Sequence, residues 1–243
     1  MSHGEVTNKA GKTVARWIFS NRQGGFSHSP YDSLNVASHV GDAPLAVAAN
    51  RAILAELLKV QPKDITWPGL VHGTDIGLIT SPLSMFPDVD VLVTSTSKRA
   101  LATMGGDCVP LLAVDPESKV ALSAHIGWKG AADSIHEAII SALESAGGKP
   151  KFTNVFLGPA ICGMCYVVEQ DRFDLVTAQL PEAGVKLPDG RLGLDLRLGL
   201  QAALRAAGMK VNQFDGCTAE SSDLYSFRRD GVTGRQAGLV VLV

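Results

Sequence analysis

The feature that most constrains this chain is a pair of apolar runs separated by a short turn. Residues 109–114 (VPLLAV) and 119–124 (KVALSA) predict buried strands, and residues 115–118 (DPES) predict the turn between them. Cys108 comes directly before the first run and His125 directly after the second. An antiparallel hairpin of this length would bring the thiol and the imidazole close together.

A second histidine, His72, lies in the turn-prone segment 70–75. One cysteine and two histidines make a three-ligand set, and three protein ligands with an open position are typical of catalytic zinc sites. Taken singly, Cys108 and His125 are better explained by a buried thiol and a satisfied core histidine. Together the three residues favour a metal site, with zinc as the first candidate ion and copper as the second.

Asp107, beside the cysteine, bears on the choice between a metal ligand and a metal-free nucleophile. A neighbouring negative charge disfavours ionisation of a thiol, whereas a bound divalent cation deprotonates it. We therefore expect Cys108 to act together with a metal, and Asp107 is the candidate for proton transfer.

Composition excludes several classes of protein. The chain has 243 residues, 22 Lys and Arg, 24 Asp and Glu and a net charge of −2, which gives no attraction to nucleic acid or to an anionic membrane. No segment approaches the roughly 18 apolar residues of a membrane helix. Residues 1–12 are polar and lack the apolar core of an export signal, so we expect a flexible N-terminal tail. Four cysteines without such a signal favour the reducing cytoplasm.

The element pattern favours an α+β fold. Strands outnumber helices and several follow one another without a helical crossover. Helices are predicted after Asp42, which would act as N-cap and present Val47, Leu54, Leu57 and Leu58 on one face, and at residues 131–146, 170–179 and 196–207. Residues 237–243 predict a closing strand. No linker or repeat divides the chain, so we expect a single domain over residues 13–243.

Two further cysteines, Cys162 and Cys165, form a CxxC motif. A zinc site would need a second ligand pair at suitable spacing, and the sequence shows none; a redox motif would need a helix N-terminus after a strand. We therefore predict that this pair is structural and neither binds metal nor reacts.

Basic side chains are candidates for anion binding. Arg228, Arg229 and Arg235 cluster in a turn-rich segment, and Lys129 follows Trp128 at a predicted helix start. Guanidinium groups bind phosphate in a bidentate way. Each of these residues alone is better explained as a solvated surface charge, whereas the group favours an anionic ligand. The chain has no P-loop and no GxGxxG motif after a strand, so nucleotide binding by those routes is unsupported.

Several blocks together resemble the laccase-domain family, once named multicopper polyphenol oxidase and better described as metal-dependent purine nucleoside phosphorylases. They run in family order from about residue 16 to residue 243, and as a set they are highly specific. The blocks are RQGGFS at 22–27, YDSLN at 31–35, VGD at 40–42, NR at 50–51, VHG at 71–73, DCVP at 107–110, HIGWKG at 125–130, LGPAI at 157–161, FRRD at 227–230 and GR at 234–235.

The resemblance implies metal ligation by His72, Cys108 and His125. It implies phosphorolysis of adenosine, inosine, guanosine and methylthioadenosine, with adenosine deamination as a second activity. It also implies a layered α/β sandwich with mixed sheets, similar in outline to cysteine-hydrolase toxins. Phosphate and nucleoside would be bound by residues drawn from Arg22, Asn35, Arg51, Lys129, Arg228, Arg229 and Arg235.

The chain departs from the family pattern in two blocks. Gly105-Gly106 stands where the family usually has Thr-Ala, and Ile126 and Lys129 stand where it usually has Ala and Arg. We expect the glycines to loosen the strand that carries Cys108, and the lysine to lack the bidentate fork of arginine.

Three other functions remain open. A thiol hydrolase would use Cys108 as nucleophile and His125 as base. A multicopper oxidase would need many more histidines than the six present. A non-catalytic binding module would show no metal-dependent turnover.

Overall fold

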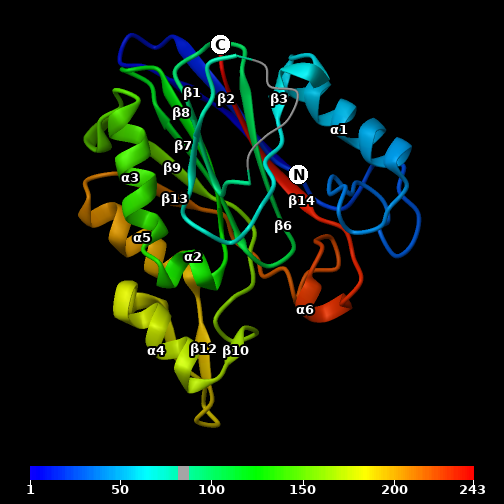
Figure 1. Cartoon of the computed structure of the whole chain (residues 1–243), viewed down its shortest axis with the longest axis vertical. Coiled ribbons are helices and arrows are strands. Elements are labelled where there is room, and N and C mark those ends of the chain that lie inside the picture. Colours follow the sequence, from blue (N-terminus) through cyan, green and yellow to red (C-terminus); the bar gives the residue numbers. More distant parts are fainter. Residues whose placement is uncertain (82–87) are drawn as a thin grey trace.

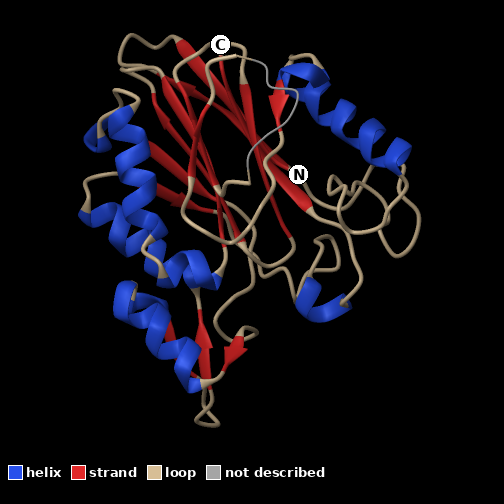
Figure 2. Cartoon of the chain, in the orientation of Figure 1, coloured by secondary structure: helices blue, strands red, loops and turns tan. Residues whose placement is uncertain are grey.

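Two large sheets form the centre of the molecule, a computed structural model that describes residues 1–81 and 88–243 (Figures 1 and 2). The five-stranded sheet has the order β1 (Ser2–Thr7), β2 (Thr13–Phe19), β14 (Gln236–Leu242), β6 (Ala100–Gly105) and β3 (Ile65–Thr66). The six-stranded sheet has the order β13 (Lys210–Gln213), β9 (Asn154–Leu157), β7 (Val109–Asp115), β8 (Val120–Ile126), β5 (Val91–Thr94) and β4 (Ile76–Leu78). Both sheets are mixed, because β3–β6, β4–β5 and β9–β13 are parallel pairs.

Helices cover the outer faces of both sheets, so the fold has four layers. The helix α1 (Pro44–Leu58) packs on the five-stranded sheet, and α3 (Ile135–Ser145) and α5 (Leu196–Ala206) pack on the six-stranded one (Figure 2). A small sheet of β10 (Val167–Val168), β12 (Leu192–Leu194) and β11 (Gly184–Lys186) lies beside α4 (Gln170–Gln179). The short helices are α2 (Trp128–Ala132), α6 (Phe227–Asp230) and the 3₁₀ turns η1 (Pro62–Asp64), η2 (Pro150–Phe152) and η3 (Pro181–Ala183). The single-domain α+β prediction is confirmed.

The central strands are buried on both faces. In β7, Leu111 belongs to the core under the helices, whereas its neighbour Leu112 belongs to the core between the sheets, where it joins Leu101 and Val240. A strand with two buried faces reads as a continuous apolar run, which is why the hairpin was visible in the sequence. The hairpin prediction is confirmed: β7 and β8 pair antiparallel, with Pro110 opposite His125.

The first residues of the chain correct one expectation. Residues 2–7 form the edge strand β1, paired antiparallel with β2, and Val6 is buried. Gly4 lies flat against Trp17, because a Cβ there would come within 2.7 Å of the indole ring. The flexible tail expected over residues 1–12 is therefore wrong for residues 2–7: a polar edge strand gains its order from backbone pairing, which leaves little apolar pattern in the sequence.

The helix predictions are confirmed at 170–179 and 196–207, as α4 and α5. The helix expected at 131–146 is two helices, because Ser134 has a left-handed backbone (φ 60°) between α2 and α3. Asp42 does not cap α1; its carboxylate accepts hydrogen bonds from Ser27 and Asn35 instead. Leu57, expected on the packed face, is 49% exposed.

The ranges 1–81 and 88–243 contain no helix with the length and apolarity needed to cross a bilayer.

Candidate metal centre and its cavity

The three predicted metal ligands lie together in the fold. Cys108 directly precedes β7, His125 lies on β8, and His72 lies in the loop between β3 and β4. The Cys108 Sγ and His72 Nε2 atoms are 3.8 Å apart, and the ligand atoms of all three residues lie within 4.8 Å of one another. The two imidazole rings meet edge to face with centroids 4.7 Å apart. One thiol and two imidazoles at this spacing fit a divalent metal of the zinc or copper type.

Glycines let the backbone approach this centre. A Cβ on Gly127 would come within 2.5 Å of the His72 ring and 3.3 Å of the Cys108 sulfur. A Cβ on Gly105 would come within 2.7 Å of the Cys108 carbonyl oxygen, and Gly105 is paired in the β6–β14 ladder opposite Gln236. Gly105 therefore lies in a close-packed, paired position, where the turn into Cys108 approaches β6. That the glycine pair loosens the ligand strand stays a prediction.

Asp90 is the residue that the sequence reasoning missed. It is 1% exposed, and its Oδ1 atom lies 2.8 Å from His125 Nδ1. Its carboxylate also accepts hydrogen bonds from the backbone N–H groups of His72 (3.1 Å) and Gly73 (2.7 Å), which hold His72 in its left-handed conformation. With its Nδ1–H donated to Asp90, His125 directs the lone pair of Nε2 to the metal position. The sequence offers one sign of this role, because the acidic Asp90 stands between Val89 and Val91 at the start of a buried strand.

The protonation of the centre follows from these contacts. Burial raises the pKa of the Cys108 thiol, but the positive charge and hydrogen bond of His125 outweigh burial and lower that pKa to about 6. Burial lowers the pKa of His125, but the Cys108 thiolate and the Asp90 carboxylate raise it to about 9. Without a metal, these contacts lower the pKa of Cys108 and raise that of His125, which favours a thiolate and a protonated imidazole over the neutral pair. The argument that Asp107 would prevent a metal-free thiolate fails.

The Asp107 carboxylate has other partners. Its Oδ1 atom accepts hydrogen bonds from the hydroxyls of Thr218 (2.6 Å) and Ser226 (2.7 Å), and its Oδ2 atom accepts one from the Arg228 backbone N–H (2.7 Å). Asp107 lines the same cavity as Cys108, but these bonds tie it to the loop between β13 and α6 and to the start of α6. The geometry favours a positioning role for Asp107 over the proton transfer expected from the sequence.

The centre forms part of the wall of a cavity of about 480 Å³. Apolar and aromatic side chains dominate its lining, together with three arginines and a third histidine. The lining residues are His39, Leu70, His72, Met104, Gly105, Gly106, Asp107, Cys108, His125, Gly127, Trp128, Ile161, Tyr166, Arg172, Leu196, Phe227, Arg228 and Arg235. A cavity of this size and composition suits a small molecule with one flat apolar part and one anionic part.

We call Arg172, Arg228 and Arg235 the cavity arginines. Arg172 lies over the Trp128 ring at 4.5 Å and was missed by the sequence reasoning, because it occurs alone on a polar helix. Arg228 lies over Tyr166 at 5.1 Å, and its single side-chain hydrogen bond among the described residues goes to the Val167 carbonyl. Most of the Arg228 guanidinium donors therefore have no protein acceptor in the described part of the chain.

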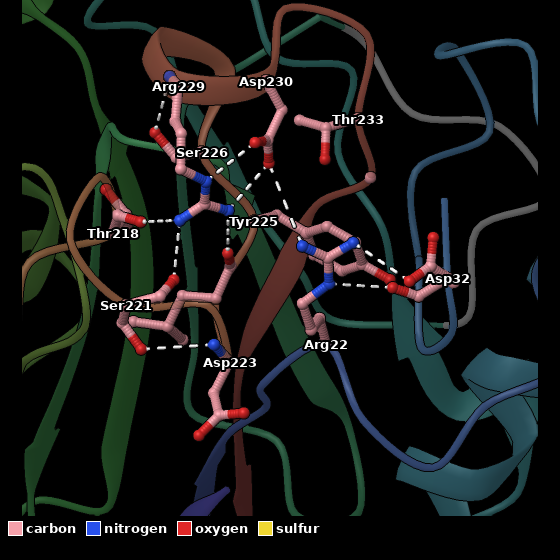
Figure 3. A network of polar contacts seen from close by, with 12 residues as sticks. Arg22, Asp32, Thr218, Ser221, Asp223, Tyr225, Ser226, Arg229, Asp230 and Thr233 are labelled. Carbon is pink, nitrogen blue, oxygen red and sulfur yellow. Dashed lines mark hydrogen bonds and ion pairs between the residues drawn. The ribbon is translucent and has the colours of Figure 1, made fainter. Parts of the chain in front are cut away.

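Arg22 and Arg229 occupy a separate cluster, which we call the arginine network, together with Asp32 and Asp230 (Figure 3). Arg229 donates through Nε and Nη2 to the Asp230 carboxylate, through Nη1 to two loop carbonyls and through Nη2 to a third. These contacts use all five N–H donors of the guanidinium. Arg22 donates to both the backbone and the carboxylate of Asp32. Arg229 therefore has no donor left for a phosphate, and Arg22 is held between Asp32 and Asp230, 3.9 Å from the latter; neither arginine belongs to the cavity lining given by the described residues.

The remaining predicted anion ligands lie outside the cavity lining. Arg51 donates to the Val36 carbonyl and stacks on Trp67, and burial lowers its pKa to about 10. Lys129 is exposed, 6.0 Å from the Trp128 ring centroid. Asn35 is buried and accepts a hydrogen bond from the Arg235 backbone N–H, so its contribution to the cavity is to hold Arg235.

The CxxC pair has neighbours that the sequence did not reveal. Cys217 and Glu220 place their ligand atoms within 4.8 Å of those of Cys162 and Cys165. The premise that no further metal ligands accompany this motif is wrong. The sequence pattern did not show them, because the two additional residues lie more than 50 positions away in the chain.

Fold and site together define a layered α+β protein with a His/Cys metal-type centre open to a cavity. Residues 16–243 match the family described as multi-copper polyphenol oxidoreductase laccase, and the chain belongs to this family. A purine nucleoside phosphorylase from Streptomyces coelicolor is 39% identical over 94% of this chain and 96% of its own length. One from Corynebacterium glutamicum is 37% identical over 93% and 94%.

Solved structures agree with this assignment. YlmD from Geobacillus stearothermophilus superposes with a TM-score of 0.88 at 31% identity, covering 94% of this chain and 92% of that one. A Neisseria meningitidis protein superposes with a TM-score of 0.85 at 32% identity, covering 94% of both chains.

Proposed function

We propose that this chain is a metal-dependent purine nucleoside phosphorylase. It would convert adenosine, inosine, guanosine or methylthioadenosine and inorganic phosphate into the free base and the ribose 1-phosphate, with adenosine deamination as a second activity. The observation that carries the proposal is the cavity in which His72, Cys108 and His125 face arginines with free donors. The names of the relatives at 37–39% identity support the same activity.

The lining suggests how each part of the substrates is bound. Trp128, Tyr166 and Phe227 offer aromatic faces on which a flat purine can stack. The cavity arginines offer forked donors that match phosphate geometry, and each of them lies over one of these rings. Base and phosphate would therefore be held side by side.

In the reaction, a phosphate oxygen attacks the anomeric carbon of the ribose as the bond from that carbon to the purine nitrogen breaks, and the purine leaves with the bonding electrons. Holding the phosphate against the sugar is the main gain that binding can supply in such a displacement. Arg228 and Arg235 would place the phosphate, and Asp107 would fix the backbone of Arg228. A divalent metal on His72, Cys108 and His125, with zinc the favoured ion and copper the alternative, would supply a Lewis acid beside the substrate.

We propose the cytoplasm as the site of action, because the four cysteines form no disulfide in the structure and need free thiols to bind a metal.

A thiol hydrolase is the second candidate. The thiolate–imidazolium pair of Cys108 and His125, oriented by Asp90, is the arrangement that such an enzyme needs. The outline likeness to cysteine-hydrolase toxins stays a prediction. A copper oxidase has less support, since only two of the six histidines belong to a potential metal cluster in the described ranges.

The test is the fate of inosine with and without inorganic phosphate. A phosphorylase must consume phosphate and release hypoxanthine and ribose 1-phosphate in equal amounts. A hydrolase would release free ribose at a rate that does not depend on phosphate, and would be inactivated by alkylation of Cys108 whether metal is present or not. Phosphate-independent release of ribose would reject the main proposal in favour of the second.

A further inference from the structure

The cluster of Cys162, Cys165, Cys217 and Glu220 lies outside the catalytic cavity. Cys162 and Cys165 occupy the loop between β9 and β10, and Cys217 and Glu220 occupy the loop between β13 and α6. The Glu220 Oε1 atom is 3.4 Å from Cys165 Sγ and 4.0 Å from Cys162 Sγ. Within the described residues, this cluster and the His72 centre are the two groups whose side chains could hold a metal ion.

Backbone contacts hold the two loops in this arrangement. Ala160 and Cys217 form a parallel bridge, in which the Thr218 N–H donates to the Ala160 carbonyl. The N–H of Cys162 donates to the Cys217 sulfur at 3.3 Å. The N–H of Cys165 donates to the Cys162 carbonyl at 3.1 Å, which closes the CxxC turn. The four side chains are therefore positioned by main-chain hydrogen bonds that do not depend on a bound ion.

The CxxC turn is also tightly packed. A Cβ on Gly163 would come within 2.5 Å of the Val185 side chain, so only glycine fits between the two cysteines without displacement of β11. The turn is followed by the two-residue strand β10 and not by a helix. A thiol of the redox CxxC type draws its reactivity from a helix N-terminus, which is missing at this turn.

The spacing matches tetrahedral zinc. Zn–S bonds of about 2.3 Å and Zn–O bonds of about 2.1 Å place neighbouring ligand atoms roughly 3.6–3.8 Å apart at tetrahedral angles. The two measured S–O separations, 3.4 and 4.0 Å, lie on either side of that value. Three thiols are soft ligands, which select zinc over magnesium or calcium. Four protein ligands leave no open position, which is the form of a structural zinc site.

We propose that Cys162, Cys165, Cys217 and Glu220 bind a structural zinc ion that clamps the loop 159–166 to the loop 217–220. Both loops hold Asp107: the Ile161 N–H donates to its carbonyl at 3.0 Å, and the Thr218 hydroxyl donates to its carboxylate at 2.6 Å. Asp107 precedes Cys108, and Ile161 lines the cavity. The ion would thus fix the wall of the cavity from outside, whatever reaction the cavity performs.

The test uses Co²⁺ as a spectroscopic substitute for zinc in the full-length Cys108→Ala variant. That background removes the thiol of the other metal centre, so any thiolate-to-Co²⁺ charge-transfer absorption must come from the proposed cluster. We expect one Co²⁺ per chain at this site, with charge-transfer bands and the strong visible bands of a tetrahedral ion. Adding Cys165→Ser should abolish the tetrahedral spectrum.

A second variant keeps the test decisive if the serine variant does not fold. Glu220 is exposed, so Glu220→Gln should fold normally and retain the thiolate bands. Its Co²⁺ affinity should fall by at least about tenfold, the lower bound for losing even an outer partner of a metal site. Glu182→Gln, at an exposed glutamate in η3, is the matched control and should bind Co²⁺ as the parent does.

Two results would overturn the proposal. One is a reduced Cys108→Ala chain that shows no thiolate-to-Co²⁺ bands, or that forms a disulfide among the three cysteines and takes up no metal. The other is unchanged Co²⁺ affinity in Glu220→Gln, which would remove the fourth ligand. Neither readout involves nucleosides, so failure here is distinguishable from failure of the proposed phosphorylase activity.

Discussion

The cavity and the arginine network both gather arginines within a few residues of one another, yet they use them in opposite ways. Arg228 lines the cavity, and most of its donors have no acceptor among residues 1–81 and 88–243, whereas the adjacent Arg229 uses every donor on Asp230 and on three loop carbonyls. Figure 3 shows Arg229 and Arg22 converging on Asp230. Of these two sequence neighbours, Arg228 is available to bind substrate and Arg229 holds the loops together.

The difference shows that a guanidinium can bind a ligand only if the fold leaves its donors unsatisfied. A donor that already has an acceptor in the protein gains little free energy by binding a phosphate, because it must first give up its existing hydrogen bond. The comparison predicts that cavity substitutions change activity without unfolding the chain, and that network substitutions do the reverse.

The largest expected effect comes from the metal centre. Cys108→Ala should lose the metal held with His72 and His125 and reduce phosphorolysis to background, while the midpoint of thermal unfolding stays within a few degrees of the parent. Elemental analysis, in which the metal content should fall by one ion per chain relative to the parent, an inosine assay and thermal denaturation measure the three quantities. Full occupancy of this centre in the variant would show that Cys108 is not a ligand.

Asp90→Asn should weaken metal binding without removing a ligand. An asparagine keeps one oxygen for the backbone N–H groups but loses the charge that orients His125 and raises its pKa. Loss of such an outer partner typically lowers metal affinity about 10–100-fold. Competition with a chelator measures the affinity, and a change below about twofold would argue against this role.

The paired variants Arg228→Ala and Arg229→Ala test the comparison itself. Arg228→Ala should raise the phosphate KM by about 10- to 150-fold, the equivalent of a charge-assisted contact of about 1.5–3 kcal/mol. Arg229→Ala should leave that KM nearly unchanged and lower the free energy of unfolding by about 1–3 kcal/mol, because it removes the donor that holds three loop carbonyls and the Asp230 carboxylate.

Steady-state kinetics and urea unfolding separate the two outcomes. Arg228→Lys is the control that keeps the positive charge but loses the bidentate guanidinium group. Its phosphate KM should lie between those of Arg228→Ala and the parent. A phosphate KM that responds to Arg229 and not to Arg228 would break the distinction between cavity and network.

The smallest effect concerns the pH dependence of the network. The hydrogen bond from Arg229 holds the pKa of Asp230 below its ordinary value despite partial burial. A depressed pKa contributes stability above the unfolded value of about 4 and loses it as pH falls through the folded value. Asp230→Asn should therefore be less stable than the parent at pH 7, by under about 1 kcal/mol for this partly exposed pair, and the difference should shrink as the pH falls below the unfolded pKa. Denaturant unfolding at several pH values tests this, and a difference that grows on acidification would contradict it.

Much of the metal centre could be predicted from the sequence, because β7 and β8 are a local hairpin. Apolar runs fix the strands, the turn fixes the register, and Cys108 and His125 follow at adjacent positions. Both central strands are buried on two faces, which makes their pattern strong.

The remaining features depend on long-range contacts that no local pattern records. Asp90 reaches His125 across the β5–β8 pair, Cys217 reaches Cys162 through a bridge between loops, and Arg172 enters the cavity from α4. The separate roles of Arg228 and Arg229 likewise depend on which carbonyls the loop 218–224 presents. Spacing in the sequence carries no information about such acceptors.

The most direct test of metal-dependent phosphorolysis is removal and restoration of the metal during inosine cleavage at saturating phosphate. Chelated and dialysed protein should form no ribose 1-phosphate, as followed by ³¹P NMR, and two equivalents of Zn²⁺, enough for both proposed sites, should restore formation of the product in the parent but not in Cys108→Ala. Ribose 1-phosphate formed at the full rate by metal-free protein would contradict the account.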